Sequence, residues 1–274
     1  MTVRIIADSS ADRNQALDAR SNIVHAPLTI QVAGHHYVDD ARIDLAALRH
    51  DIQRSDLPAK TAGVTPQRFL EAAGEADEIY IVTISQQLSG TYSNALLAAR
   101  EMEEAGRRVT VFDTASAASG TTAVALFLEQ AVEAGKSREK ICAETQAYIE
   151  GLRTWFVLDD LSTLSKAGRM PKMAGRIMSG LSIKLICRGN HGKIEINAPR
   201  RGMESALDSL AKKIHQDPVD FSKRTLYISH VHAPERARGL ANRLEDVGFA
   251  GIEILEASGL VTVYANEGGI VIAY

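Results

Sequence analysis

Cysteine and aromatic residues are both scarce in this sequence. Its 274 residues include two cysteines, Cys142 and Cys187, which stand far apart and form no CxxC pair. Neither a disulfide framework nor a thiolate metal site is indicated, and a reducing cytoplasm is the expected compartment. Aromatic side chains make up 5% of the chain, so Ala, Leu, Ile and Val supply most of its 45% hydrophobic content.

Long apolar runs and blocks of like charge are absent too. The chain reaches Asp8 after a few apolar residues, too short a run for a signal-peptide core, and no later run approaches a membrane span. The 31 basic residues are scattered among 34 acidic ones, for a net charge of -3. This balance disfavours nucleic acid as a partner. We therefore expect a cytoplasmic protein that touches a membrane surface at most transiently.

The commonest catalytic and cofactor motifs are missing as well. The sequence contains no HExxH, GxSxG, GxGxxG or GxxxxGK[ST] segment, which removes the usual protease, esterase, dinucleotide and NTPase signatures. His230 and His232 share one side of a predicted strand but have no carboxylate or cysteine at ligand spacing, and the adjacent His35 and His36 would point to opposite faces. No metal site, cofactor or catalytic residue is predicted.

In the first half of the chain, short apolar runs alternate with helical periodicity. Strands are predicted at 3–7, 78–84 and 108–112, and each is followed by a helical pattern. The first of these helices is expected to begin near Ala11. Thr65-Pro66 predicts the start of another, with Thr as cap and Pro at the first helical position. This alternation is typical of βα units on a parallel sheet, and we assign residues 1–152 to one lobe.

The pattern changes in residues 153–274, which we assign to a second, smaller lobe. Strands are expected at 155–158, 182–187, 193–196, 226–231, 252–257 and 270–274, and helices at 161–167, 170–179, 203–215 and 234–247. Two of these strands flank the turn GNHG. A hairpin with neighbouring helices indicates an α+β arrangement.

The segment SQQLSGTY follows a predicted strand and opens the next helix. Free backbone N–H groups and the positive end of the helix dipole attract anions there, and Gly90 lets a ligand approach the backbone. The hydroxyls of Ser89 and Thr91 add donors. A carboxylate or phosphate would fit, and simple helix capping by Ser89 is the alternative. Hydroxyl-rich loops at 7–12, 60–66 and 113–120 are expected to converge on the same crevice.

The second half offers arginines in SKAGRM, which contains Arg169, and in APRRG, which contains Arg201. The planar donor fork of arginine suits an anionic head group better than the point charge of lysine. Ordinary solvated surface arginines are the alternative.

These motifs resemble the DegV family over the whole chain. The resemblance rests on ADSSAD, KTAGVTP, ISQQLSGTYSNA, VFDTASAASG, LSTLSKAGRMPK with GLSIKLI, the Arg201 segment, and the closing SGLVTVYANEGGIVIAY. It implies an α/β fold with two lobes and a lipid tunnel between them. One is a three-layer α/β/α lobe with a parallel sheet, and the other is a smaller two-layer α/β lobe with a mixed sheet.

The resemblance also implies a set of ligand-binding residues: Thr61, Ser89, Gly90, Thr91, Arg201 and Tyr264. Two departures from the family pattern affect this set. Tyr264 begins the stretch YANEG, where the family usually has His-Thr-Gly-Pro-Gly, and a tyrosine donates a hydrogen bond but does not titrate like His. KTAGVTP lacks the glutamine that the family usually carries there.

The expected function is that of a non-catalytic carrier, as the resemblance implies. It would bind a long-chain fatty acid and present the carboxylate to a separate fatty acid kinase. Aliphatic walls suit a flexible acyl tail, although they also suit an ordinary Ala-rich core. At ~0.8 kcal/mol per CH₂, a tail of about 14 methylenes would contribute roughly 11 kcal/mol before ordering costs. A Ser89-dependent lipid hydrolase and a lipid carrier without a kinase partner are the alternatives.

Overall fold

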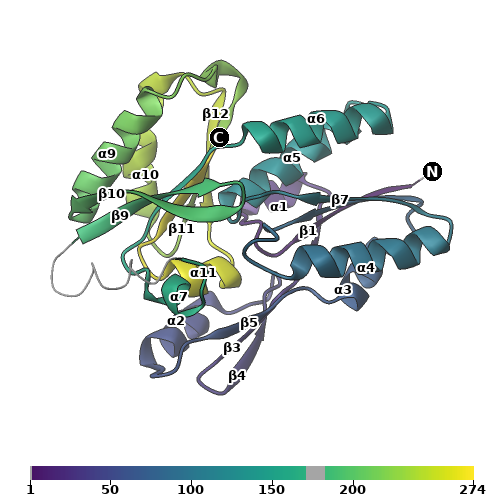
Figure 1. Cartoon of the computed structure of the whole chain (residues 1–274), viewed down its shortest axis with the longest axis horizontal. Helices are drawn as coiled ribbons and strands as arrows, with labels where there is room; N and C mark the ends of the chain where they lie inside the picture. The colour runs from purple at the N-terminus through teal and green to yellow at the C-terminus, as the bar shows by residue number, and fades with distance from the viewer. Residues whose placement is uncertain (1, 171–182) are drawn as a thin grey trace.

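The computed structural model describes residues 2–170 and 183–274, and three β-sheets organise them. Sheet A is parallel, with the strand order β2-β1-β6-β7 (Figure 1). Its strands are β1 (Val3–Asp8), β2 (Val24–Ala26), β6 (Glu78–Thr83) and β7 (Arg108–Asp113).

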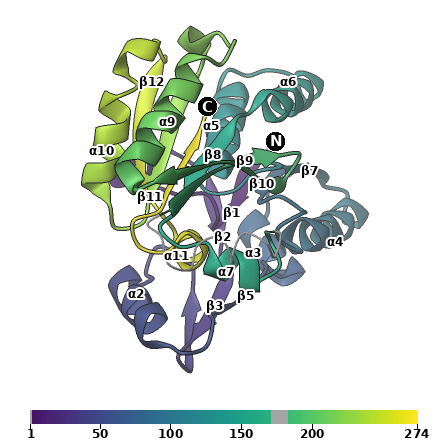
Figure 2. The ribbon, with the colours of Figure 1, turned by 60° about the vertical axis from the view of Figure 1, so that its left-hand side comes forward.

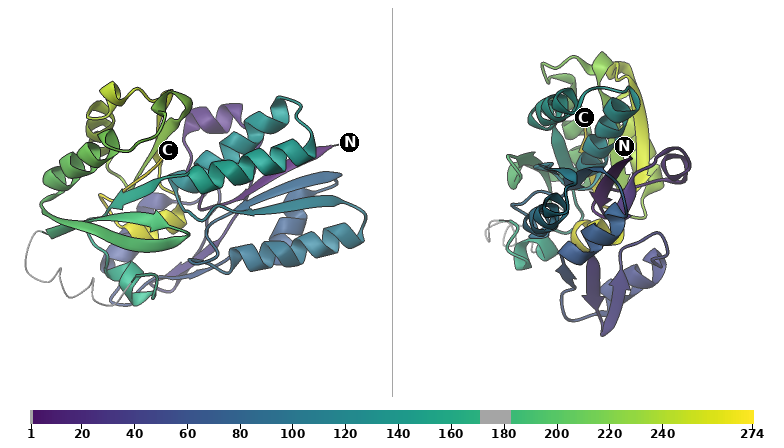
Figure 3. Two further views of the ribbon diagram at one scale, coloured as in Figure 1. Left: turned by 45° about the horizontal axis from the view of Figure 1, so that its top comes forward. Right: turned by 90° about the vertical axis from the view of Figure 1, so that its right-hand side faces the viewer.

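Helices cover both faces of sheet A (Figure 3, left). One face carries α3 (Pro66–Ala73) and α4 (Thr91–Glu104), and the other carries α5 (Ser119–Glu133) and α6 (Arg138–Gly151). Because side chains alternate along a strand, Ile79 and Ile81 of β6 pack toward α3 and α4, whereas Tyr80 and Val82 pack toward α5 and α6. The predicted three-layer α/β/α arrangement is confirmed.

Sheet B is mixed and has six strands in the order β10-β9-β8-β13-β11-β12. They are β8 (Thr154–Val157), β9 (Ile183–Asn190), β10 (Lys193–Arg201), β11 (Thr225–His230), β12 (Gly251–Glu256) and β13 (Ile270–Ala273). The β11–β12 pair is parallel and the other pairs are antiparallel, which confirms the predicted mixed sheet. Helices α9 (Met203–His215) and α10 (Pro234–Asn242) pack on one face.

Helix α5 joins the two sheets. Val124 and Leu128 pack on sheet A, whereas Ala123 and Leu126 contact Tyr227 of β11 and its neighbours on sheet B. Buried on both sides, this helix lacks a polar stripe. All strands of sheet A precede residue 152 and all strands of sheet B follow it, and we propose this residue as the boundary between the lobes.

A third, antiparallel sheet lies below the other two in Figure 1 and has the order β4-β3-β5. Its strands are β3 (Thr29–Val32), β4 (His35–Val38) and β5 (Lys60–Ala62). Helices α2 (Leu45–Arg54) and α11 (Gly259–Ala265) pack beside it, and α11 also contacts α7 (Ser162–Lys166) (Figure 2). The remaining elements are α1 (Gln15–Arg20) and the short 3₁₀ helices Phe221–Lys223 and Glu245–Val247. None of the described helices is long and apolar enough to span a bilayer.

One local prediction was wrong, and one helix was not predicted. The first helix begins at Gln15 rather than near Ala11, because Asn14 is its cap and accepts a hydrogen bond from Leu17 N at 2.8 Å. Helix α11 was missed, because its sequence GLVTVYA is rich in β-branched residues that favour strands. The cap formed by Thr65 is confirmed. The helix expected at 170–179 falls almost entirely outside the described residues.

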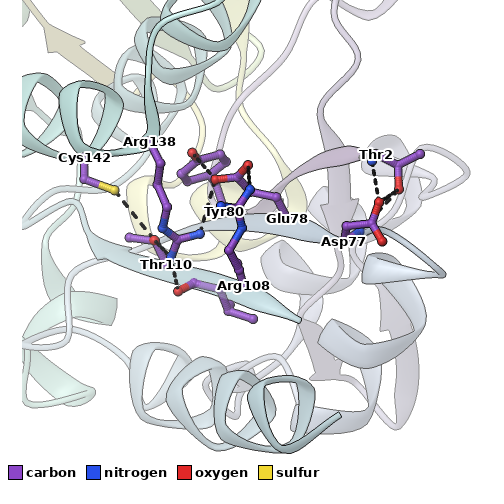
Figure 4. Close-up of polar contacts among 9 residues, drawn as sticks. Thr2, Asp77, Glu78, Tyr80, Arg108, Thr110, Arg138 and Cys142 are labelled. Carbon is purple, nitrogen blue, oxygen red and sulfur yellow. Dashed lines mark hydrogen bonds and ion pairs between the residues drawn. The ribbon is translucent and has the colours of Figure 1, made fainter. Parts of the chain in front are cut away.

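A buried carboxylate ties β6, β7 and α6 together at the amino end of sheet A (Figure 4). Glu78 is 4% exposed and accepts hydrogen bonds from Arg108, Arg138 and Tyr80 at 3.0, 3.2 and 2.8 Å. Arg138 also donates to Thr110 Oγ1 at 2.7 Å. Arg138 of α6 thus compensates part of the buried charge of Glu78 on β6, so this cluster holds α6 against the sheet.

Two further carboxylates are buried at the opposite end, one on the last residue of β1 and one just after it. Asp8 accepts hydrogen bonds from Ser10 N at 2.8 Å and Ile84 N at 2.6 Å. Asp12 accepts one from Ser258 N at 2.7 Å, at the start of α11. Burial raises the pKa of Asp8 to about 6 and that of Asp12 to about 7, because loss of hydration outweighs these hydrogen bonds.

Replacing Asp12 by Asn should make the protein progressively more stable than the wild type as pH rises. The folded pKa of Asp12 is above its unfolded value, so the stabilisation from its proton is complete below about pH 4 and is lost as pH rises through about 7. Urea unfolding should therefore show the free energy of unfolding of Asp12→Asn, relative to wild type, increasing on the order of 1 kcal/mol per pH unit between about pH 5 and 7. Asp8 is present in both proteins, so its contribution to the pH dependence cancels in the difference. A difference that is constant across pH would contradict the prediction.

Candidate functional site

A cavity of about 250 Å³ lies between the carboxyl ends of the strands in sheet A and the inner face of sheet B. The loops after β6 and β7 form one side of it. Strand β8, the β9–β10 hairpin, α7 and α11 form the other. In open α/β sheets, ligands bind at the carboxyl ends of the strands, so this cavity is the leading candidate for a binding site.

The wall of the cavity is mostly aliphatic. On β8, Phe156 and the following Leu158 face the cavity, whereas Trp155 and Val157 pack toward α9. The larger apolar lining residues are Leu28, Ile84, Leu88, Phe156, Leu158, Leu164, Ile194, Leu260, Val261 and Val271. Such a lining favours a hydrocarbon chain over a polar ligand.

Four of the predicted ligand-binding residues, Thr61, Ser89, Gly90 and Tyr264, line this cavity. Thr61 on β5 and Tyr264 on α11 are 203 residues apart in the sequence, and their hydroxyl oxygens are 2.8 Å apart. Ser89 Oγ lies 2.9 Å from Thr91 Oγ1, which brings the fifth predicted residue to the same place. We call Thr61, Ser89, Thr91 and Tyr264 the hydroxyl cluster.

Glycines allow the loops of this cluster to approach one another. A Cβ atom at Gly63 would lie 2.8 Å from Thr91 Oγ1 and 3.4 Å from Ser89 Oγ, so the loop around residue 63 reaches α4 only without a side chain. Gly90 is the N-cap of α4, and that helix has no side-chain cap. Thr91 N donates to Ser89 Oγ at 3.2 Å, and the backbone N–H groups that follow it, with the positive end of the helix dipole, lie beside the cavity.

Two cations line the cavity, Arg169 and Lys193. Arg169 Nε donates to Leu88 O at 3.1 Å, which places the guanidinium beside the Ser89 loop. Arg201 is not among the lining residues of the described part. It is exposed at the far end of β10 opposite Ile183, roughly 27 Å along the strand from Lys193 at ~3.4 Å per residue. Its contact with a ligand carboxylate stays a prediction.

The described lining contains no His, Asp or Glu. Ser89 therefore has a hydroxyl neighbour rather than a carboxylate or imidazole base. No group of three or more metal-ligating side chains occurs among the described residues. This part of the chain offers hydrogen-bond donors and positive charge, a combination that binds an anion.

The loop at 7–12 does not line the cavity, although the sequence suggested that it would converge there. It lies behind α11 and holds that helix instead. Ser9 of this loop donates from its Oγ to Asp39 Oδ2 at 2.8 Å. Asp39, which follows β4, also accepts two hydrogen bonds from the start of α11: Gly259 N donates to Oδ1 at 2.7 Å and Leu260 N donates to Oδ2 at 3.0 Å. This loop contributes by positioning the helix that carries Tyr264.

The tip of the β9–β10 hairpin closes one side of the cavity. His191 and Gly192 have φ angles of 46° and 80°, the left-handed conformations of a type I′ turn. Ser85 Oγ donates to Gly192 O at 2.9 Å, joining the tip to the loop after β6. A Cβ atom at position 192 would lie 2.3 Å from Ser85 Oγ, so this contact requires glycine. Nothing in the sequence pattern marked this pairing.

The fold and the cavity together define a class of α/β proteins that enclose an apolar cavity between a parallel and a mixed sheet and line it with hydroxyl groups. The DegV family model matches residues 2–274. This chain belongs to the DegV family, as the resemblance predicted. A DegV domain-containing protein from Streptococcus pneumoniae is 30% identical over 284 residues, which cover 100% of this chain and 99% of that relative.

Solved structures show the same fold with fatty acids bound. A DegV family protein from Ruminococcus gnavus, with vaccenic acid, is 32% identical with a TM-score of 0.92 over 100% of both chains. The Streptococcus pneumoniae Fatty Acid Kinase B3 protein, loaded with linoleic acid, is 28% identical with a TM-score of 0.92 over 100% of this chain and 99% of that one. A DegV family protein from Eubacterium eligens, loaded with heptadecanoic acid, is 29% identical with a TM-score of 0.91, covering 99% and 98%.

Replacing Gly192 by Ala should separate the hairpin tip from the Ser85 loop. Gly34→Ala is a matched control, because Gly34 occupies the equivalent turn position in the β3–β4 hairpin with φ 82° and has no atom within 4 Å of a built Cβ. Both variants should lose about 1 kcal/mol of stability from backbone strain. Only Gly192→Ala should also increase hydrogen exchange at residues 84–88 and 189–194. Equal exchange in the two variants would show that the tip does not depend on this contact.

Proposed function

We propose that this protein is a non-catalytic carrier that binds a long-chain fatty acid in the cavity between the two sheets. The observation that carries the proposal is an aliphatic cavity whose described lining contains Thr61, Ser89 and Tyr264 of the hydroxyl cluster together with Arg169, and no acidic side chain. The fatty acids in the related structures support the same ligand class.

The acyl tail supplies most of the affinity in this proposal. Each buried CH₂ contributes ~0.8 kcal/mol before the cost of ordering the chain. The carboxylate loses its hydration, and charge-assisted hydrogen bonds of roughly 1.5 to 3 kcal/mol each mainly offset that loss. The hydroxyl cluster therefore sets the orientation of the ligand, with the acid end toward Thr61, Ser89 and Tyr264.

We further propose that the bound carboxylate is presented to a fatty acid kinase. The name of the related Streptococcus pneumoniae Fatty Acid Kinase B3 protein supports this partner. The exposed guanidinium of Arg169 lies beside the hydroxyl cluster, so the acid end of the ligand would sit near the surface of the protein. A carrier that works without a kinase would use the same cavity. Tyr264, which stands where the family usually has His, is the reason for retaining this alternative.

A Ser89-dependent lipid hydrolase is the alternative of another class, and the geometry disfavours it. Serine attack requires a base within hydrogen-bond reach, whereas Ser89 Oγ is paired with Thr91 Oγ1 and the described lining has no His or carboxylate. Ester hydrolysis abolished by Ser89→Ala would support the hydrolase. Native mass spectrometry with denaturing release should instead yield a long-chain fatty acid from the purified protein.

Ser89→Ala and Tyr264→Phe should each weaken the binding of palmitic acid by about tenfold or more, because each removes a hydroxyl donor to the carboxylate. Calorimetric titration of delipidated protein measures the change. Cetyl alcohol, which has the same chain but no carboxylate, should be affected much less.

Ser222→Ala, which removes an exposed hydroxyl that donates to Asp220, serves as the control and should bind like wild type. If both site variants bound the acid and the alcohol with unchanged affinity, the carboxylate would not lie at the hydroxyl cluster.

Arg169→Ala should weaken binding of palmitic acid more than Arg201→Ala. The Arg169 guanidinium lies beside the Ser89 loop. Arg201 is at the end of β10 that is farther from the cavity-lining residue Lys193. Each variant removes one positive charge, so a difference in affinity between them reports the effect of the position of the arginine. A larger loss for Arg201→Ala would place the carboxylate at Arg201 and overturn this assignment.

A further inference from the structure

Two hydroxyl groups meet in the cavity outside the hydroxyl cluster. Ser116 lies in the loop after β7, on the side of sheet A, and Thr154 begins β8 on sheet B. Both line the cavity, and Ser116 Oγ is 2.8 Å from Thr154 Oγ1. They form a polar position in an otherwise aliphatic stretch of the wall.

Apolar side chains lie beside this pair on β8. On the side of sheet A, Ser85 links the pair to the loop of the hydroxyl cluster, because Ser85 N donates to Ser116 O at 2.8 Å and Ser89 N donates to Ser85 O at 3.1 Å. Thr154, Phe156 and Leu158 face the cavity in succession, so Thr154 and Leu158 lie roughly 13 Å apart at ~3.3 Å per residue. Leu158 belongs to the apolar cluster against which Tyr264 packs. A ligand with its acid end at the hydroxyl cluster would therefore bring a position partway along its tail, rather than its far end, beside Ser116 and Thr154.

Gly120 preserves the space around the pair. A Cβ atom at Gly120 would lie 1.9 Å from Ser116 Oγ and 3.2 Å from Thr154 Oγ1. A Cβ atom at Gly189 would lie 3.4 Å from Thr154 Cβ. A side chain at position 120 would displace the hydroxyls, whereas a Cβ at position 189 would make an ordinary van der Waals contact, so Gly120 is the residue that allows the pair to meet at the wall.

The pair has hydrogen-bonding capacity to spare. Two hydroxyls carry two donors and four lone pairs. Within the described residues, they use one mutual hydrogen bond and one long contact from Ser116 Oγ to Ala117 O at 3.5 Å. A ligand oxygen beside them would gain a partner, whereas the same oxygen against the aliphatic wall would lose its hydration without compensation.

We infer that the cavity favours a fatty acid with a hydroxyl group partway along its tail, which Ser116 and Thr154 bind. The inference rests on the proposed fatty acid binding and refines its substrate class. The selectivity depends on position: a hydroxyl at the depth of the pair is favoured, and one elsewhere on the tail is disfavoured relative to the unsubstituted acid.

The test compares stearic acid with a series of hydroxystearic acids that differ in the position of the hydroxyl, titrated into delipidated protein. Wild type should bind isomers within one narrow range of positions roughly threefold to tenfold more tightly than stearic acid, and the others more weakly. The double variant Ser116→Ala/Thr154→Val should lose that preference and retain stearic acid binding, which also shows that it folds.

Ser119→Ala is the matched control, because the Ser119 hydroxyl donates to Val271 O and Ser119 is not among the lining residues. It should keep the wild-type preference. Stearic acid binding with no preferred isomer, or a preference that survives in the double variant, overturns this inference alone. If wild type bound neither stearic nor hydroxystearic acid, the proposed function would fail together with it.

Discussion

The carboxylate of Asp39 is the constraint on which the cavity depends. It is 4% exposed and accepts hydrogen bonds from the first two N–H groups of α11 and from Ser9, so it joins the loop after β1, the small antiparallel sheet and the C-terminal part of the chain. A carboxylate buried this deeply is tolerated only with such partners. Gly259 makes the contact possible, because a Cβ there would lie 2.7 Å from Asp39 Oδ1. Through this anchor, α11 holds Tyr264 at the hydroxyl cluster.

This arrangement assigns separate tasks to separate parts of the molecule. Helix α5 packs between sheets A and B and keeps them at a set distance. The cavity occupies the space beyond the strand ends, where loops can vary without breaking the sheets. Charged clusters such as that around Glu78 lie at the opposite end of sheet A and stabilise its packing. The proposed carrier function needs a shaped cavity and an oriented head group rather than a base, and the described polar groups are placed in accordance with that proposal.

Helix starts could be predicted from the sequence where the capping hydrogen bond is local. Thr65 before Pro66 correctly marked a helix start, since a cap involves only neighbouring residues. The first helix was placed too early, because serines and aspartates near residue 10 bond to distant loops instead of capping. Helix α11 was missed for a related reason: its β-branched residues favour a strand, and the anchoring carboxylate lies 220 residues away in the sequence.

The sequence by itself determined the family, the parallel and mixed sheets, and the Ser89-Gly90-Thr91 segment at a helix N-terminus, because these depend on periodicity and on contacts within a few residues. Tertiary structure decided which side chains share the cavity. It paired Thr61 with Tyr264, placed Arg169 in the described lining, and joined Ser116 to Thr154. Such convergence depends on how two sheets pack through a shared helix, and no spacing along the chain encodes that geometry.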